Sequence, residues 1–483
     1  MSGTADVGAI SETRASDPRD PAVGGPVEIR NAAALCDHGL AALRASALRV
    51  AAAGLGAADV GRATEATISL TDRGVRVGAR EYDLEPDSRV LVLGAGKASL
   101  AIAAALERAL GDRISAGAVA VPAGEETSLE RIEVLGADHP LPSDRSMAAA
   151  ERLVELAGDA GEGDLALACF TGGSSALASL PPPDVTRDEK RRLHELLLAA
   201  GMPIAEINTV RKHVSAFKGG RLAAALAPAR IVNLSASDVA GDALDTITDP
   251  TVPDRSTVAE AVAVLRDYGL WSEVPGSVRA HLEADVAASP SLDGVEIESI
   301  LLATGAGVCD AMAGEAEAIG LRPVVLSTTL QGEAREIGRV VANLASESSR
   351  NGGPFAAPAL LLACGGEATV TLGSAPPGLG GPNQEAALGA ALELEGAQVV
   401  AVFLDTDGSD GSTAAAGAVA DGLTVERSRD RDVNLRRALL AHRAGEALGE
   451  LGDLVVTGPT GTNVNDLVVV AIAAADAGAQ RGG

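Results

Sequence analysis

From about residue 88 onward, short runs of β-branched and leucine residues alternate with longer stretches that have helical apolar spacing. This alternation predicts strands joined by helical crossovers in a mainly parallel sheet, so we expect an α/β protein. The expected strands are 89–93, 165–170, 231–234, 300–303, 324–328, 360–364, 399–404 and 454–457. Nearly every one runs into a polar, glycine-rich turn. Ligands of open α/β sheets bind at the carboxyl ends of the strands, so these turns should carry the chemistry.

The length of 483 residues exceeds the size at which one hydrophobic core keeps growing, and we therefore expect two domains. The stretch from about Tyr268 to Leu292 holds the only tryptophan and interrupts the alternation, which favours an inter-domain region there. The predicted division is a disordered tail over 1–28, an amino-terminal domain over 29–280 and a carboxyl-terminal domain over 290–475.

The chain is strongly acidic, with 66 Asp plus Glu against 39 Lys plus Arg and a formal charge of −27. Such a charge repels nucleic acid and anionic membrane surfaces, so neither is an expected partner. The sequence has no signal segment and no apolar run long enough for a membrane helix, and its four cysteines form no CxxC pair. We expect a soluble cytoplasmic protein. Its composition fits either a salt-loaded cytosol or a GC-rich genome, and the oligomeric state stays open, a homodimer included.

Lysine is almost absent, with only Lys97, Lys190, Lys212 and Lys218 in the whole chain. Lys97 follows a predicted strand in the turn Gly94-Ala95-Gly96-Lys97, where backbone amides and a helix N-terminus favour an anion. Lysine supplies a compact point charge that suits a phosphate. The turn lacks the third glycine of a dinucleotide fingerprint and the Walker A frame, and a plain βα turn with a solvated lysine is the alternative.

Two further segments of the first half suit anions. The turn Gly172-Gly173-Ser174-Ser175 offers hydroxyls and successive amides, and a serine nucleophile there would lack both the nucleophile-elbow frame and a His–acid pair. The segment 207–221 gathers four cations in an acidic chain, with a solvated helix face as the alternative. Just downstream, Asp238 and Asp242 follow a strand, where they could hold magnesium.

The second half has polar turns of the same kind. Glu367 follows one strand, Asn383 opens a helix, and Asp407 and Asp410 follow another strand. The Asp-rich loop lacks the bidentate glutamate of a calcium loop, and an ordinary Asx-Gly turn is its alternative reading.

In chain order the motifs are GAGKA, HPLPS, GGSSAL, NTVRKHVSAFKGGRLA, SDVAGD, TVPDRST, GGEATVT, GGPNQE, DTDGSDG and TGPTGTNVNDL. This ordered set resembles the type II glycerate kinase family, whose carboxyl half is called the MOFRL domain. The resemblance implies a Rossmann-like three-layer amino-terminal domain, a smaller mixed α/β carboxyl-terminal domain, and an active site between them. It also implies phosphorylation of D-glycerate by ATP with Mg2+, usually at the 2-hydroxyl.

The expected site residues combine the resemblance with the chemistry of the turns. The expected catalytic residues are Lys97, Arg211, Lys212 and Asp238. The expected substrate- and nucleotide-binding residues are Gly94, Gly96, Gly172, Gly173, Ser174, Ser175, Ser215, Lys218, Glu367, Asn383, Thr460 and Asn463. The expected metal ligands are Asp242, Asp407 and Asp410, although the four aspartates could exchange the roles of ligand and base. Pro382 stands where relatives often carry arginine, which puts the substrate contacts there in doubt.

Two other functions remain as alternatives. A nicotinamide-dependent hydroxypyruvate reductase would need a complete dinucleotide fingerprint, whereas Ser99 stands near the third glycine position. A non-catalytic sugar-acid binding protein would keep the anion sites but lose the metal-binding acids, and here the acids are present.

Overall fold

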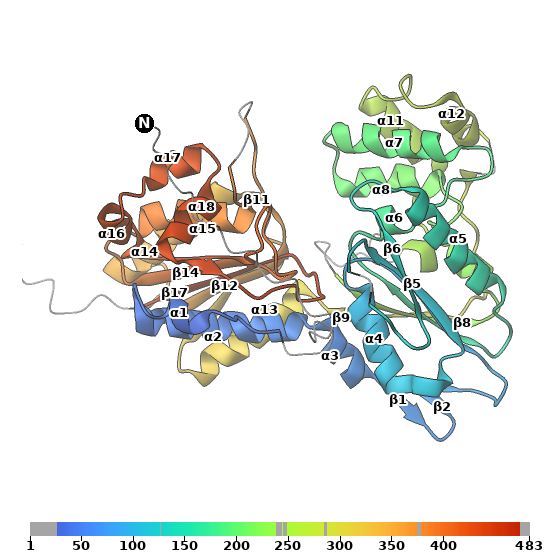
Figure 1. Ribbon diagram of the computed structural model, residues 1–483, viewed down its shortest axis with the longest axis horizontal. Coiled ribbons are helices and arrows are strands. Elements are labelled where there is room, and N and C mark those ends of the chain that lie inside the picture. Colours follow the sequence, from blue (N-terminus) through green and yellow to red (C-terminus); the bar gives the residue numbers. More distant parts are fainter. Residues whose placement is uncertain are drawn as a thin grey trace, which may run out of the picture.

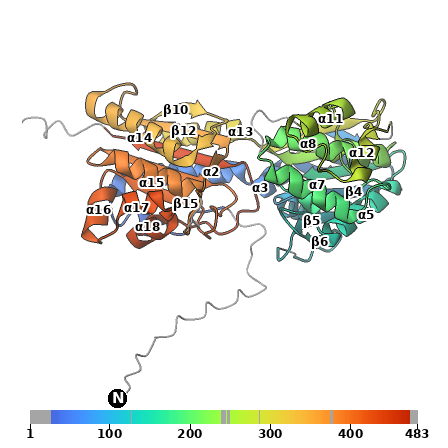
Figure 2. The same cartoon turned by 90° about the horizontal axis from the view of Figure 1, so that it is seen from above.

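The computed structural model describes residues 27–125, 127–237, 244, 249–284, 287–373 and 378–473. The chain forms two α/β bodies that lie side by side, each built on a six-stranded sheet (Figure 1). The view from above shows α2 and α3 running along the line that joins the two bodies (Figure 2). Among these residues, no helix is both long and apolar enough to cross a membrane.

The first sheet is parallel throughout, as expected. Its strands are β4 (Val90–Ala95), β5 (Ala116–Pro122), β6 (Glu133–Ala137), β7 (Leu165–Phe170), β8 (Arg230–Ala236) and β9 (Ile297–Ala303). They lie in the order β6-β5-β4-β7-β8-β9. From β4 the chain adds β5 and then β6 toward one edge of the sheet, and from β7 it adds β8 and then β9 toward the other edge. This reversal is the switch point at which doubly wound sheets bind their ligands.

Helices cover both faces of this sheet and make three layers. On one face lie α3 (Val60–Thr67) and α4 (Ser99–Leu110), and on the other lie α5 (Asp144–Gly158) and α9 (Arg221–Leu226). A separate helical group packs around its own apolar core; it comprises α7 (Arg187–Ala199), α8 (Ile204–His213), α11 (Val258–Asp267) and α12 (Gly276–Leu282). The Rossmann-like three-layer expectation is confirmed.

The second sheet is mixed. Its strands are β10 (Arg322–Ser327), β12 (Ala359–Gly366), β14 (Val399–Asp405), β15 (Gly417–Asp421), β16 (Leu454–Val455) and β17 (Asp466–Ile472). In the order β10-β12-β17-β14-β15-β16, only β10 and β12 run parallel. One face is covered by α14 (Ala334–Asn351) and α15 (Pro382–Leu394), and the other by α2 (Ala41–Ala58) and α13 (Gly305–Ala318).

The remaining elements are short. The first body carries an antiparallel hairpin sheet of β1 (Ile68–Thr71), β2 (Gly74–Val77) and β3 (Arg80–Asp83), together with helix α6 (Ser174–Leu177). The second body carries α1 (Ala32–Leu35), α16 (Thr424–Asp430), α17 (Leu435–Leu440), α18 (Ala444–Leu451), and the small pair β11 (Gly332–Glu333) and β13 (Ala368–Thr369).

The division between the bodies differs from the predicted ranges 29–280 and 290–475. Strand β9 pairs with β8 and therefore belongs to the first sheet, although it lies beyond residue 290. Helix α2 packs against β14, β17 and α13, so the first described residues belong to the second body. The stretch 268–292 contributes Leu270, Val274 and Val278 to the core of the helical group and is not a linker.

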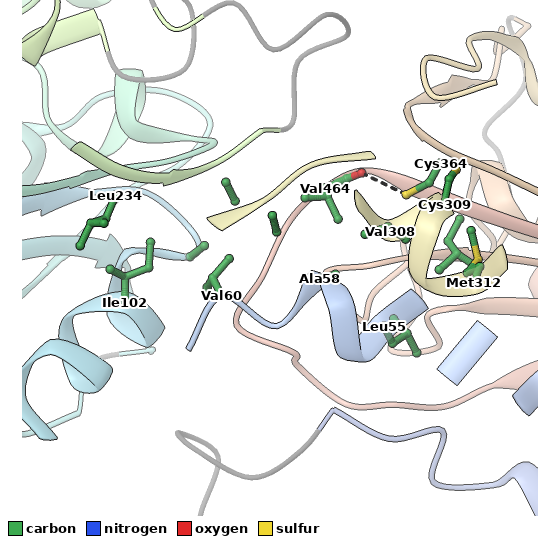
Figure 3. Close-up of a cluster of buried hydrophobic side chains, with 14 of the residues drawn as sticks. Leu55, Ala58, Val60, Ile102, Leu234, Val308, Cys309, Met312, Cys364 and Val464 are labelled. Atoms are coloured by element: carbon green, nitrogen blue, oxygen red, sulfur yellow. Dashed lines mark hydrogen bonds between the residues drawn. The ribbon is translucent and has the colours of Figure 1, made fainter. Parts of the chain in front are cut away.

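The apolar core is continuous across the junction between the bodies (Figure 3). Leu55 and Ala58 of α2 belong to the same buried cluster as Val60 of α3, Ile102 of α4 and Val464 of the loop before β17. The short link between α2 and α3 thus passes through this core. The two bodies are joined by packed side chains as well as by the chain itself.

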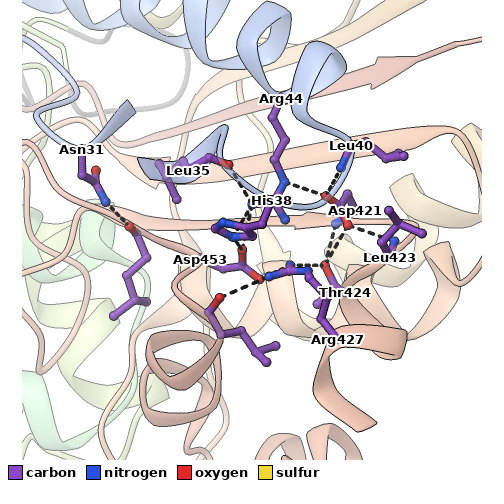
Figure 4. A network of polar contacts seen from close by, with 12 residues as sticks. Asn31, Leu35, His38, Leu40, Arg44, Asp421, Leu423, Thr424, Arg427 and Asp453 are labelled. Atoms are coloured by element: carbon purple, nitrogen blue, oxygen red, sulfur yellow. Dashed lines mark hydrogen bonds and ion pairs between the residues drawn. The ribbon is translucent and has the colours of Figure 1, made fainter. Parts of the chain in front are cut away.

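A buried ionic network holds α2 on the second body (Figure 4). The Arg44 guanidinium lies 2.5 Å from Asp421 and 2.8 Å from Asp453, and none of the three side chains is exposed. Asp453 also accepts from Arg427 at 2.6 Å and lies 2.9 Å from the His38 ring. One arginine near the start of the described chain therefore neutralises two carboxylates near its end.

We expect Arg44→Met to lower the free energy of unfolding by about 3–5 kcal/mol, because it leaves the buried Asp421 carboxylate without its counter-charge and removes one of the two arginines that pair with Asp453. The matched control is Arg49→Met on the same helix, whose side chain is 62% exposed and pairs with Glu315. The control should cost only about 0–1 kcal/mol. Urea denaturation followed by circular dichroism measures both, and equal losses would contradict the importance of the network.

Candidate active site at the domain junction

Two glycine-rich turns meet at the switch point of the first sheet. The backbone N–H of Lys97 donates to Gly172 O at 2.9 Å, and the N–H of Ala98 donates to Thr171 Oγ1 at 3.1 Å. Gly96 has a φ of +138°, and a Cβ there would lie 2.1 Å from Thr171 Oγ1. Glycine is thus required at position 96 for the two turns to come this close.

The side chain of Lys97 extends from this turn to the second body. Its Nζ lies 3.1 Å from Oδ2 of Asp407, which follows β14. Burial acts to lower the pKa of Lys97, but the Asp407 carboxylate outweighs it and raises that pKa. Lys97 is therefore an ammonium group, and it is 37% exposed at a place where both bodies contribute side chains.

A second cationic group lies at the end of α8. Arg211 is 5% exposed, and its Nε has no hydrogen-bond partner within the described ranges. Burial lowers the pKa of Arg211 to about 10, against the opposing effect of Asp249. Lys218 Nζ lies 2.8 Å from Asp249 Oδ2 and donates to Ser175 Oγ at 2.8 Å. One cation of segment 207–221, Lys218, thus contacts the serine turn that the sequence analysis proposed as an anion site.

Lys212 and Ser215 of the same segment have other partners. Lys212 Nζ lies 3.2 Å from Asp254, and both side chains are nearly fully buried. Ser215 Oγ accepts from the backbone N–H groups of Phe217 and Lys218 at 3.1 and 3.0 Å. The sequence analysis assigned Lys212 to catalysis, but its ammonium group forms the ion pair with Asp254. Ser215 stabilises the turn that carries Lys218.

His139 is a candidate that the sequence analysis did not single out. It follows β6, and its ring atoms Cδ2 and Nε2 lie 3.3 and 3.4 Å from where a Cβ would stand at Gly173. Burial, Lys97 and Arg211 lower the pKa of His139, so its imidazole is neutral at pH 7. The available signal was its place in the HPLPS motif, since the strand before it, β6, was not among the expected strands.

The second body brings carboxylates to the junction. Asp405 ends β14 and stands directly opposite Asp466 of β17. Asp466 accepts from Ala368 N at 2.6 Å and from Asn383 Nδ2 at 2.5 Å. Burial raises the pKa of Asp466 to about 7. Burial and the neighbouring Asp407 carboxylate raise the pKa of Asp405 well above its usual range.

Asp410 caps the N-terminus of α15. Its two oxygens accept from the backbone N–H groups of Asn383 and Gln384 at 3.0 and 2.8 Å. Burial raises the pKa of Asp410 to about 6. A carboxylate that caps a helix in this way has fewer lone pairs for a metal, although the sequence analysis placed a ligand here.

The other predicted residues of the second body shape turns or face solvent. Thr460 Oγ1 donates to Thr406 O at 2.6 Å, and Asn463 Oδ1 accepts from Asn465 N at 3.0 Å. Glu367 is exposed at the end of β12. Asp238 and Asp242 lie outside the described residues. Within the part of the chain that the structure describes, no group of three or more His, Cys, Asp or Glu side chains is arranged to hold a metal ion.

We expect Asp466→Asn to stabilise the protein at pH 8 in EDTA and to have little effect at pH 4. The folded-state pKa of Asp466 is about 7, above the ordinary 3.8, so the stabilising protonated form is lost as pH rises through 7. Asparagine resembles the protonated acid and, after rotation of the Asn383 amide, keeps both hydrogen bonds. We expect a gain of about 1–3 kcal/mol, since three pKa units correspond to roughly 4 kcal/mol at most.

Thermal unfolding at both pH values measures the effect. Asp310→Asn, at an exposed position of α13, is the matched control and should change nothing at either pH. A variant that is less stable than the native protein at pH 8 would contradict the raised pKa of Asp466.

Family models match both halves of the chain. A model described as a domain of unknown function (DUF4147) matches residues 46–283, and the MOFRL family matches residues 360–466. The chain is 36% identical to a glycerate 2-kinase of Pyrococcus horikoshii, over 89% of this chain and 97% of that protein. It is 43% identical to an Agrobacterium vitis protein with a provisional hydroxypyruvate reductase name, over 80% and 88% of the two chains.

A solved structure has the same fold. The crystal structure of a glycerate kinase from Thermotoga maritima superposes with a TM-score of 0.73 at 37% identity, over 80% of this chain and 92% of that one. The relatives are matched along almost their whole length, through both bodies. By sequence and by fold, the chain belongs to the glycerate kinase family with a MOFRL domain in its carboxyl half.

Proposed function

We propose that this protein transfers the γ-phosphoryl group of ATP to the 2-hydroxyl of D-glycerate. The observation that carries the proposal is the contact between Lys97 and Asp407, since it brings the cationic turns of the first body to the acidic turns of the second. Phosphoryl transfer needs alignment of the reactants and neutralisation of phosphate charge, and little covalent help. The family and the names of the kinase relatives support this reaction.

The cations have distinct places in this proposal. Lys97 lies in a turn at the switch point and acts on the transferring phosphoryl group, because a compact ammonium there can approach its equatorial oxygens. Lys218 contacts Ser175 and Arg211 lies near Lys218, and the two cations bind the carboxylate of the substrate or a phosphate of the nucleotide. The Nε of Arg211 has no hydrogen-bond partner among the described residues, and it is a donor that such an anion would satisfy.

Magnesium fits the acidic side of the site. Asp405, Asp407 and Asp466 supply oxygen donors, which this ion prefers, and the raised pKa values of Asp405 and Asp466 indicate negative charge without a full counter-charge. These carboxylates are the oxygen donors that would hold the ion, although the described residues do not arrange three of them around one position. The bound ion would neutralise phosphate charge. The sequence-based assignment of Asp242 to the metal remains a prediction.

We place the reaction in the cytoplasm. All four cysteines are free thiols, and three of them are buried. Free, buried thiols in a chain without disulfides are typical of a reducing compartment.

The direct assay contains purified protein, ATP, MgCl2 and D-glycerate, coupled to enolase without phosphoglycerate mutase. Formation of phosphoenolpyruvate at 240 nm is the expected result, because enolase accepts 2-phosphoglycerate alone. Product that enolase consumes only after mutase is added would overturn the 2-hydroxyl. NADH oxidation with hydroxypyruvate, without use of ATP, would instead support the reductase name of the Agrobacterium relative.

Lys97→Met should lower kcat/KM at least about 100-fold, because it removes one positioned electrostatic group from the reacting phosphoryl. Lys97→Arg keeps the positive charge but replaces the compact ammonium by a planar guanidinium, so this variant should retain only part of the activity. The melting temperature should change little, since the Lys97 side chain is 37% exposed. Near-normal turnover by the methionine variant would show that Lys97 forms only a surface ion pair and has no catalytic role.

His139→Gln should lower kcat/KM about 100-fold and remove an acid limb from its pH profile. Because burial, Lys97 and Arg211 lower the pKa of His139, the native imidazole is neutral at pH 7, and its protonation in acid removes its acceptor nitrogen. Glutamine does not titrate, so the limb that belongs to His139 should disappear. The test is kcat/KM measured from pH 5 to 8. An unchanged profile in the variant would contradict a role of the His139 imidazole as a proton acceptor in the reaction.

A further inference from the structure

The segment between α8 and α9 carries the anion-binding side chains but has little regular structure of its own. Helix α8 ends at His213 and α9 begins at Arg221. Arg211 lies in the last turn of α8, and Lys218 lies in the loop. Their position therefore depends on the side chains that fix this loop.

Asp254 is the main acceptor that fixes one side of the loop. Its side chain has no exposed surface and receives Lys212 Nζ at 3.2 Å. It also accepts from the N–H and Oγ of Ser256 at 2.9 and 2.7 Å and from Ser289 Oγ at 2.7 Å. His213 Nε2 lies 3.7 Å away. One carboxylate thus joins the end of α8 to two other loops of the first body.

Arg221 fixes the other side of the same loop. Its guanidinium donates to Lys212 O at 3.1 Å and Lys218 O at 3.0 Å, and also to the backbone oxygens of Ala287 and Ala288. At the turn between them, a Cβ on Gly219 would lie 3.2 Å from Asp254 Oδ2. The loop is therefore enclosed between one buried carboxylate and one guanidinium.

Neighbouring cations of the segment consequently have different partners. Lys212 pairs with Asp254, whereas Lys218 pairs with Asp249 and contacts Ser175. Burial opposes ionisation of Asp254, but the hydrogen bonds from Ser289 and Ser256, with Lys212, lower its pKa below the usual range. Asp254 is therefore a charged partner for Lys212.

We propose that Asp254 is a positioning residue for substrate binding, which holds Lys212 out of the anion site and thereby sets Arg211 and Lys218 against Ser175. The proposal rests on the proposed glycerate kinase activity of the same site. It assigns Lys212 to the support of the site and not to contact with the substrate. Removal of one partner of a buried ion pair leaves the other charge uncompensated, so loss of Asp254 should displace the loop.

The test compares Asp254→Asn, Lys212→Met and the double variant with the native protein. Asp254→Asn should raise KM for D-glycerate at least about tenfold and change kcat by less than about threefold, as expected when binding of the substrate is weakened. The double variant has no unpaired ammonium and should recover KM to within about threefold of native, which a double-mutant cycle detects as coupling. Asp293→Asn, on the exposed loop nearby, should leave both constants unchanged.

Calorimetric titration with D-glycerate provides a readout that does not require turnover. If native protein neither binds nor phosphorylates glycerate, the proposed function fails; if native protein does both and Asp254→Asn equals it, the positioning role fails. Should Asp254→Asn not fold, the double variant carries the test. Weak glycerate binding by a folded double variant would overturn the proposal, because pairing with Lys212 would then not be the role of Asp254.

Discussion

Burial of the mixed sheet on both faces is the constraint on which the rest of this structure depends. Its inner strands are apolar on both sides: Leu361 and Val468 belong to one core cluster, while Leu360 and Leu467 belong to the other. The second of these clusters is completed by α2 and α13. The helix α2, near the start of the described chain, thus covers a sheet whose last strand ends at Ile472. Arg44 holds it there through buried ion pairs with Asp421 and Asp453.

The same arrangement separates the charges of the site between the two bodies. Lysine and arginine side chains gather on the turns of the parallel sheet, while aspartates gather where β14 ends and β17 begins. Burial, and after it the neighbouring Asp407 carboxylate, raise the pKa of Asp405, so charge on the acidic turns is unfavourable without a cation. Lys97 supplies one such cation through its ion pair with Asp407. Two half-sites of opposite sign are therefore suited to enclose a ligand that carries both anionic groups and a cation.

The local sequence pattern predicted the fold class and several strands. The strands, domain boundaries and side-chain partners that it missed depend on contacts between distant parts of the chain. The run 165–170 matches β7 residue for residue, because a continuous apolar segment before a Gly-Gly turn has few other solutions. In the two large sheets, the strands β5, β6, β15 and β17 were missed. Strand β5 is rich in alanine and glycine, and β17 directly follows a loop that reads as turn residues. The domain ranges were misplaced because nothing local in 41–58 reveals which sheet that helix covers. The turns alone singled out Lys97, Lys218 and Ser175 as candidates, whereas the partners of Lys212 and Asp410 come from contacts made across the fold.

The position of α2 also has a consequence for biosynthesis. The helix is made first, yet the strands that bury its apolar face end with β17, near the end of the described chain. The parallel sheet can fold during translation, because all its strands lie before residue 304. Throughout that time α2 has an apolar face without its partner. The nascent chain therefore exposes an apolar helix face, which is an aggregation hazard, until β17 has been made.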